Sequence, residues 1–102
     1  MKIWLDDIRL PPDDTWTWCK TVASAQVYFH FGSVWPIEVI SFDHDLGDNV
    51  PTGYDLAKYI EANCATGKNI MPKAWAIHSA NPVGRENIRK AMESAERFLT
   101  SA

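Results

Sequence analysis

The sequence lacks a long apolar run, a cysteine framework and an excess of positive charge. No apolar stretch approaches the length that crosses a bilayer, and residues 1–7 lack the apolar segment and cleavage site of a signal peptide. We therefore expect a cytoplasmic protein with no membrane partner. The two cysteines, Cys19 and Cys64, have no CxxC spacing, which predicts buried thiols in a reducing compartment and excludes a disulfide-stapled scaffold.

The formal net charge is −3, so an extended basic groove for nucleic acid is not expected. Residues 1–50 hold eight acidic and three basic side chains, whereas residues 51–102 hold five acidic and seven basic ones. The acidic groups are therefore concentrated in the first half. A length of 102 residues with 46% hydrophobic residues predicts one domain that spans residues 1–102.

Short apolar segments alternate with helical patterns along the chain. We expect strands at residues 3–5, 15–20, 37–42 and 74–77, and helices at about 21–31, about 54–64 and from Pro82 to Leu99, with Asn81 as N-cap of the last. This order predicts an α/β protein with right-handed crossovers and a parallel sheet that has helices on both faces. The first connection is too short for a crossover helix, so either it is tight and extended or the second strand pairs differently.

Polar side chains follow three of the predicted strands. Because the carboxyl ends of parallel strands meet at one edge of a sheet, we expect these residues to converge there. They are Asp6 and Asp7 after the first strand, Asp43, His44 and Asp45 after the third, and His78 and Ser79 after the fourth. This convergence is the main functional signal in the sequence.

Carboxylates that pack together need a cation or bound protons to offset their repulsion, which predicts a metal site at Asp6, Asp7, Asp43 and Asp45. Oxygen ligands favour Mg²⁺, whereas the two nearby imidazoles would shift the preference toward Mn²⁺ or Zn²⁺. The other interpretation is that three of these aspartates, Asp6, Asp7 and Asp45, only cap loops and helices.

Both histidines at the strand ends have a chemical and a structural interpretation. His78 lies between a strand and a helix start and is a candidate general acid or base, as is His44 between its two aspartates. The amide groups at the start of the last helix offer an anion site, to which Ser79 and Arg85 would add phosphate contacts. Arg9 would do the same from the first loop, unless it is an ordinary surface arginine.

The tryptophans also have two interpretations. Trp4 and Trp75 lie in central strands and are expected in the core, whereas Trp16 or Trp18 could present a stacking surface to a base.

The combination of motifs resembles the receiver domain of two-component signalling and, more closely, the cyclic-phosphate processing receiver-like family. The segments that carry this resemblance are Trp4–Arg9, Ser41–Gly47 with its DHDLG motif, Gly53–Asp55, and His78–Arg85 with its HSANPxGR pattern. They span nearly the whole chain. The resemblance implies a single three-layer, shortened flavodoxin-like domain with strand order 2-1-3-4.

The resemblance also implies activity on a cyclic phosphate, such as the 2′,3′-cyclic end that RNA cleavage leaves. It places the candidate catalytic residues His78, His44 and Asp43 in one site with Asp6, Asp7, Asp45 and Ser79, supported by Asn81 and Arg85. The chain departs from an ordinary receiver because it has no strand after the last helix. The lysine that accompanies the acidic pocket of receivers therefore has no equivalent, and stable aspartyl phosphorylation is not expected.

Our preferred hypothesis is a metal-assisted phosphoesterase that acts on a small cyclic phosphate or an RNA end. The alternative is a non-catalytic module that binds a cyclic nucleotide or a protein, as a signalling adaptor or a phage counter-defence protein would. A phosphorylatable response regulator ranks third because of the missing lysine. The sequence alone decides neither the substrate nor the oligomeric state.

Overall fold

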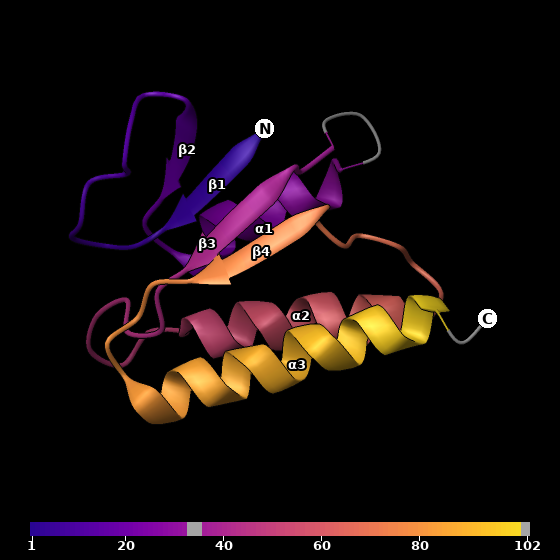
Figure 1. Ribbon diagram of the computed structural model, residues 1–102. Helices are drawn as coiled ribbons and strands as arrows, with labels where there is room; N and C mark the ends of the chain where they lie inside the picture. The colour runs from indigo at the N-terminus through magenta and orange to yellow at the C-terminus, as the bar shows by residue number, and fades with distance from the viewer. Residues whose placement is uncertain (33–35, 101–102) are drawn as a thin grey trace.

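The computed structural model describes residues 1–32 and 36–100, which form a four-stranded parallel sheet and three helices (Figure 1). The elements in chain order are β1 (Lys2–Leu5), β2 (Trp16–Cys19), α1 (Val22–His30), β3 (Val39–Phe42), α2 (Gly53–Ala65), β4 (Ala74–Ile77) and α3 (Pro82–Thr100). The strand order is β2-β1-β3-β4, which confirms the predicted order and the α/β class. In these residues no helix is both long and apolar enough to cross a membrane.

The connection between β1 and β2 is short and contains no helix, as in the first of the two alternatives that the sequence left open. β2 pairs with β1 in parallel, with Ile3 beside Thr17 and Leu5 beside Cys19. Residues 6–15, which join the two strands, contain no helix. Pro11 and Pro12 fall in this segment and disfavour a helix there, because proline lacks an amide donor and has a fixed φ. β2 is therefore an edge strand reached without a crossover helix.

All three helices pack against the same face of the sheet, so the expectation of helices on both faces, in three layers, was wrong. The chain steps from β2 across β1 to β3, and then from β3 to β4, in the same direction across the sheet. Right-handed crossovers that step in one direction place their helices on one face. Only the step from β1 to β2 runs the other way, and that connection has no helix. The described residues thus form two layers.

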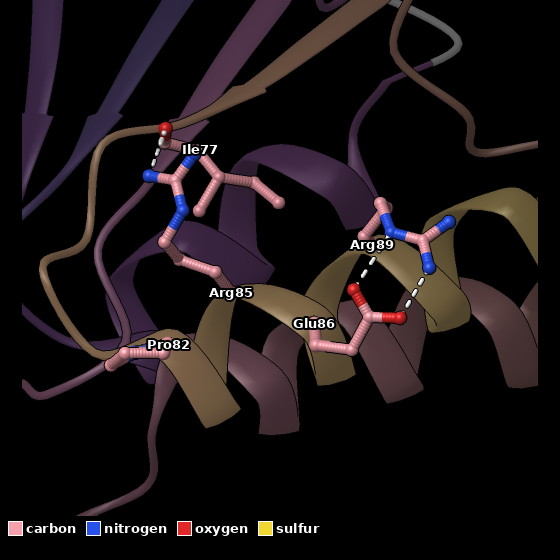
Figure 2. A pocket seen from close by; sticks show the side chains of 5 residues that line it. All are labelled: Ile77, Pro82, Arg85, Glu86 and Arg89. Carbon is pink, nitrogen blue, oxygen red and sulfur yellow. Dashed lines mark hydrogen bonds and ion pairs between the residues drawn. The ribbon is translucent and has the colours of Figure 1, made fainter.

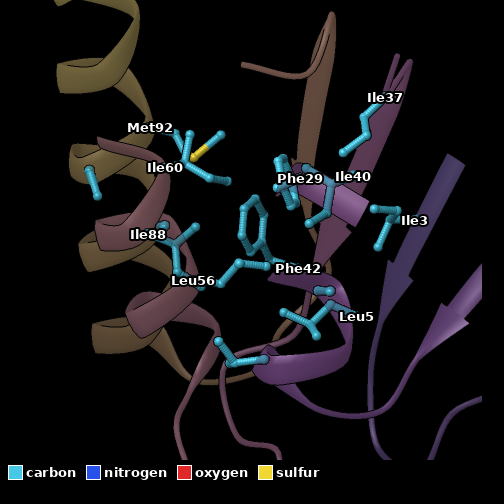
Figure 3. Close-up of a cluster of buried hydrophobic side chains, with 14 of the residues drawn as sticks. Ile3, Leu5, Phe29, Ile37, Ile40, Phe42, Leu56, Ile60, Ile88 and Met92 are labelled. Carbon is cyan, nitrogen blue, oxygen red and sulfur yellow. The ribbon is translucent and has the colours of Figure 1, made fainter. Parts of the chain in front are cut away.

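The core lies between that face and the helices, as Figure 3 shows. Ile3 and Leu5 of β1 and Ile40 and Phe42 of β3 are fully buried on the helix-facing side. The helices contribute Phe29 from α1, Leu56 and Ile60 from α2, and Ile88 and Met92 from α3. Both cysteines are free and buried, as the sequence predicted, and burial raises the pKa of each thiol.

The helix starts follow local chemistry. Thr52 and Asp55 form a capping box at the start of α2, in which each side chain binds the backbone amide of the other residue. α3 begins at Pro82, and the Asn81 Oδ1 accepts a hydrogen bond from the Gly84 amide at 2.9 Å, which confirms the predicted N-cap. Both starts place helix amides near the carboxyl ends of the strands.

The opposite face of the sheet carries tryptophans and is covered by no helix of the described residues. Trp4 pairs in register with Trp18 on one side and Ser41 on the other, so the three side chains share this face. Trp4 also meets Trp16 edge to face, with ring centroids 5.7 Å apart. Trp4 is half-buried on this face, so its expected place in the core was wrong. Two of these indole rings contact the candidate site: Trp4 stacks on the His78 ring, and Trp18 Nε1 donates a hydrogen bond to the Asp6 carbonyl.

Candidate functional site

Three carboxylates from two strand ends meet at the carboxyl edge of the sheet. Asp6 and Asp7 follow β1 and Asp43 follows β3, and one oxygen of each lies within 4.8 Å of the others. They face a hollow of about 410 Å³. The residues that line this acidic hollow are Asp6, Asp7, Ile8, Arg9, Asp43, Asp45, Gly47 and Asp48. The parallel sheet therefore gathers the carboxylates as the strand ends predicted.

Asp6 is the most buried and most firmly held of the three. Asp6 is 1% exposed. Its Oδ1 accepts hydrogen bonds from the backbone amides of Ile8, at 2.9 Å, and Arg9, at 2.8 Å. Its Oδ2 lies 3.0 Å from His78 Nε2. Burial alone would raise the pKa of Asp6, but these hydrogen bonds outweigh it and hold the pKa below the ordinary aspartate value. Asp6 is therefore ionised. The protein fills three of the roughly four acceptor positions of a carboxylate, which leaves one on Oδ2.

Asp45 lies beside the three grouped carboxylates and has other partners. Its Oδ1 is 3.0 Å from His44 Nδ1, and its Oδ2 accepts a hydrogen bond from Asn81 Nδ2 at 3.3 Å. The hydrogen bond with His44, and then that with Asn81, lowers the pKa of Asp45. Its side chain is 67% exposed, so the assignment of Asp45 as a metal ligand stays a prediction.

His78 is fixed between two side chains and an aromatic ring. Its Nε2 meets Asp6, its Nδ1 lies 2.7 Å from Ser41 Oγ, and its ring stacks on Trp4 with centroids 3.8 Å apart and planes 4° apart. Both ring nitrogens are therefore engaged within the protein. Sequence reasoning missed Ser41 and Trp4 as site residues, although a serine inside the apolar β3 segment was a readable signal.

His44 joins the loop after β3 to the start of α3. Its Nδ1 lies between Asp45 and Asn81, and a Cβ added to Gly84 would overlap its ring. Gly53 makes a similar close approach at the start of α2, where a Cβ would overlap the carbonyl oxygen of Asp43. His44 does not line the acidic hollow. The two glycines were missed by sequence reasoning, because the contacts that require them are distant in sequence.

The candidate phosphate contacts fall into two groups. Arg9 lines the acidic hollow and donates from Nη1 to the His78 carbonyl at 3.1 Å. Ser79 is 4% exposed, and its Oγ accepts a hydrogen bond from the Asn81 amide at 3.1 Å. Arg85 instead donates to the carbonyls of Ile77 and Ser79, at 3.1 and 2.9 Å.

Arg85 lines a separate hollow, which has a volume of about 510 Å³. Figure 2 shows Arg85 on α3, with its guanidinium group directed toward Ile77 at the end of β4. The other lining residues of this hollow are Ile77, Pro82, Glu86 and Arg89. The structure thus places Arg9 at the carboxylates and Arg85 in a different hollow. Phosphate binding by Arg9, Ser79, Asn81 and Arg85 stays a prediction.

The three grouped carboxylates suit a hard divalent cation. The donor set at Asp6, Asp7 and Asp43 consists of carboxylate oxygens, which are ligands of divalent cations. The His78 nitrogen nearest to them is already bound to Asp6. The residues therefore fit a cation that binds through carboxylate oxygens.

The sequence matches the family of cyclic-phosphate processing receiver domains over residues 1–94. The chain belongs to this family. The match confirms the resemblance in the motifs and agrees with the strand order of the sheet. Searches of curated proteins and of solved structures find no match to the chain. For this receiver domain, the association with cyclic phosphates thus comes from the family, and the carboxylate geometry comes from the structure.

Proposed function

We propose that this receiver domain is a metal-assisted phosphoesterase that opens a cyclic phosphodiester, such as a 2′,3′-cyclic nucleotide or RNA end. The observation that supports this most is the grouping of a buried, ionised Asp6 with Asp7 and Asp43 in one hollow. Such a group is unfavourable unless a cation offsets its charge. The family description supports the substrate class.

In this proposal Asp6, Asp7 and Asp43 hold the divalent cation. When bound, the cation polarises the phosphoryl group and offsets its negative charge. Arg9 uses one of its roughly five donors on the His78 carbonyl, so the remaining donors are available to a phosphate oxygen in the same hollow. The hydroxyl of Ser79 and the amides of the first turn of α3 supply further phosphate contacts.

The reaction adds one water and breaks one P–O bond of the ring, which leaves a phosphate monoester and a free hydroxyl. The attacking water loses a proton and the departing ribose oxygen gains one. We assign this transfer to His78, with His44 as a second candidate. His78 is part of a hydrogen-bond chain with Asp6 and Ser41, and one of its two bonds must give way when its proton moves.

The test is turnover of 2′,3′-cyclic nucleotides by the purified protein with Mg²⁺ or Mn²⁺, with the monoester followed by ³¹P NMR. We expect opening that EDTA stops and that Asp43→Asn reduces to background, because this substitution removes one of the three grouped ligands. Asp48→Asn removes the same charge from the same hollow but outside the three, and should keep most of the turnover. No opening across a panel of cyclic phosphates and both metals contradicts the proposal.

One observation favours a second candidate, a module that binds a cyclic nucleotide without turning it over. Both ring nitrogens of His78 are engaged by Asp6 and Ser41, which suits a residue that shapes the site, whereas proton transfer would require one of these bonds to break. Calorimetry with a cyclic nucleotide in EDTA separates the candidates. Binding that persists without metal and without turnover supports the module.

A further inference from the structure

Ser41 is a buried hydroxyl group inside an otherwise apolar strand. It is the third residue of β3, pairs with Trp4 in register, and is 5% exposed. A buried hydroxyl without a partner is costly, and the partner of Ser41 is His78 Nδ1, at 2.7 Å. His78 in turn reaches Asp6 with its other nitrogen. Ser41 therefore stands at the far end of a chain of hydrogen bonds that leads to the carboxylates.

We propose that Ser41 is a positioning residue, which fixes the His78 ring and thereby orients Asp6 toward a divalent cation. This inference rests on the proposed function, because it concerns the same carboxylates. His78 Nε2 lies 3.0 Å from Asp6 Oδ2, and His78 Nδ1 lies 2.7 Å from Ser41 Oγ, so the ring bridges the two side chains. Hydrogen-bonded partners of this kind orient metal ligands and tune their basicity.

Stacking on Trp4 does not by itself fix the orientation of the His78 ring. Trp4 covers one face of the ring with nearly parallel planes, and a half-turn about the Cβ–Cγ bond would keep this stacking while it exchanges each ring nitrogen for a carbon. The bond to Asp6 holds one edge of the ring, and the bond to Ser41 holds another. Both bonds form in only one of the two orientations, so together they select it. His78 then holds Asp6 Oδ2 in place while one acceptor position of that oxygen stays open.

The experiment compares Ser41→Thr with Ser41→Val, which have nearly the same shape and differ in the hydroxyl. Mn²⁺ affinity of the full chain is measured by calorimetry, without substrate. We expect Ser41→Thr to bind Mn²⁺ like the wild type and Ser41→Val to bind it about 10-fold more weakly, as loss of a partner behind a metal ligand typically does. Val39→Ala, which trims the same face of the same strand, should leave the affinity unchanged.

A second measurement does not depend on the metal. In ¹⁵N NMR of the metal-free protein at fixed pH, wild type and Ser41→Thr should show the same chemical shift of a hydrogen-bonded His78 Nδ1, and Ser41→Val should change that chemical shift. Thermal scans check folding, and Ser41→Ala replaces the valine variant if that variant does not fold.

Equal Mn²⁺ affinity in the threonine and valine variants overturns the inference, and so does an unchanged His78 spectrum in Ser41→Val. A wild-type protein that binds no Mn²⁺ also overturns it. A protein that binds Mn²⁺ in a Ser41-dependent way but opens no cyclic phosphate leaves the inference standing and overturns the proposed function.

Discussion

At the scale of single residues, the site depends on side chains with several partners and on positions where a side chain is missing. Asp6 is buried yet ionised, because two backbone amides and His78 replace the water that it has lost. Gly84 lacks a side chain where the His44 ring lies against α3. The loop after β3 can approach the helix only because this position has no Cβ.

Gly84→Ala should lower the free energy of unfolding by about 1–3 kcal/mol, because the new methyl group overlaps the His44 ring. A loss of stability would be informative, because alanine in place of a glycine inside a helix ordinarily raises the free energy of unfolding by up to about 1 kcal/mol. Urea unfolding measures the change. Adding His44→Ala should restore part of the loss.

Gly53→Ala is the matched comparison. There the clash is with the backbone carbonyl of Asp43, so His44→Ala should restore nothing. A neutral or stabilising effect of Gly84→Ala contradicts the packing described for His44.

At the scale of elements, the helix starts hold the site loops in place. α2 follows the Asp43–His44 loop and begins with the Thr52–Asp55 capping box, and the Gly53 amide donates to the His44 carbonyl at 2.9 Å. α3 follows His78 and Ser79 and begins with the Asn81 cap. The loops that carry the candidate site therefore lead directly into these caps.

Thr52→Ala should cost about 1 kcal/mol of stability at pH 7, because the Thr52 hydroxyl caps the Asp55 amide in the first turn of α2. Asp55 adds a pH dependence. The backbone amide of Thr52 lowers the pKa of Asp55 from its ordinary 3.8, against the effect of burial and together with Lys58. The contribution of the Asp55 carboxylate to the free energy of unfolding is therefore complete above about pH 4. It is lost as the pH falls through the lowered pKa that Asp55 has in the folded protein.

Urea unfolding at pH 7 and at acid pH tests this. Asp55→Asn should flatten the acid decline of stability, whereas Glu61→Gln, on the same helix but outside the capping box, should leave it as in the wild type. An unchanged decline in Asp55→Asn contradicts the prediction.

At the scale of the whole molecule, one-sided coverage of the sheet explains why the carboxylates and the tryptophans are neighbours. The helices occupy one face, so the ring of His78 is free to lie on Trp4 at the other face and still reach Asp6. The three carboxylates at the shared edge bring like charges together, an arrangement that a bound cation would stabilise. Bound cation should therefore add stability to the whole fold.

Mn²⁺ should raise the midpoint of thermal unfolding, and EDTA should reverse the rise. At a free concentration of about 100 times the dissociation constant, the gain is about 2.7 kcal/mol. Asp43→Asn should lose most of this gain and Asp48→Asn should keep it. NaCl at equal ionic strength is the control for screening, and an equal rise with NaCl argues against a specific site.

Local sequence determined the elements and much of the candidate site. Apolar runs located the strands, and Asn81 followed by Pro82 marked the start of α3, because caps and prolines act within a few residues. Alternation of strands and helices predicted a parallel sheet, and a parallel sheet brings the residues that follow its strands to one edge. The meeting of Asp6, Asp7 and Asp43 was readable for that reason.

The tertiary structure alone decided which face the helices cover and how the site residues bond. The helix face follows from the direction in which each crossover steps across the sheet, and this direction depends on strand order, which no single segment encodes. Ser41 and His78 meet although they are 37 positions apart, and Arg85 binds the carbonyls at the end of β4, away from the acidic hollow. Such contacts depend on packing between distant segments, so they exist only once the sheet and its helices are assembled.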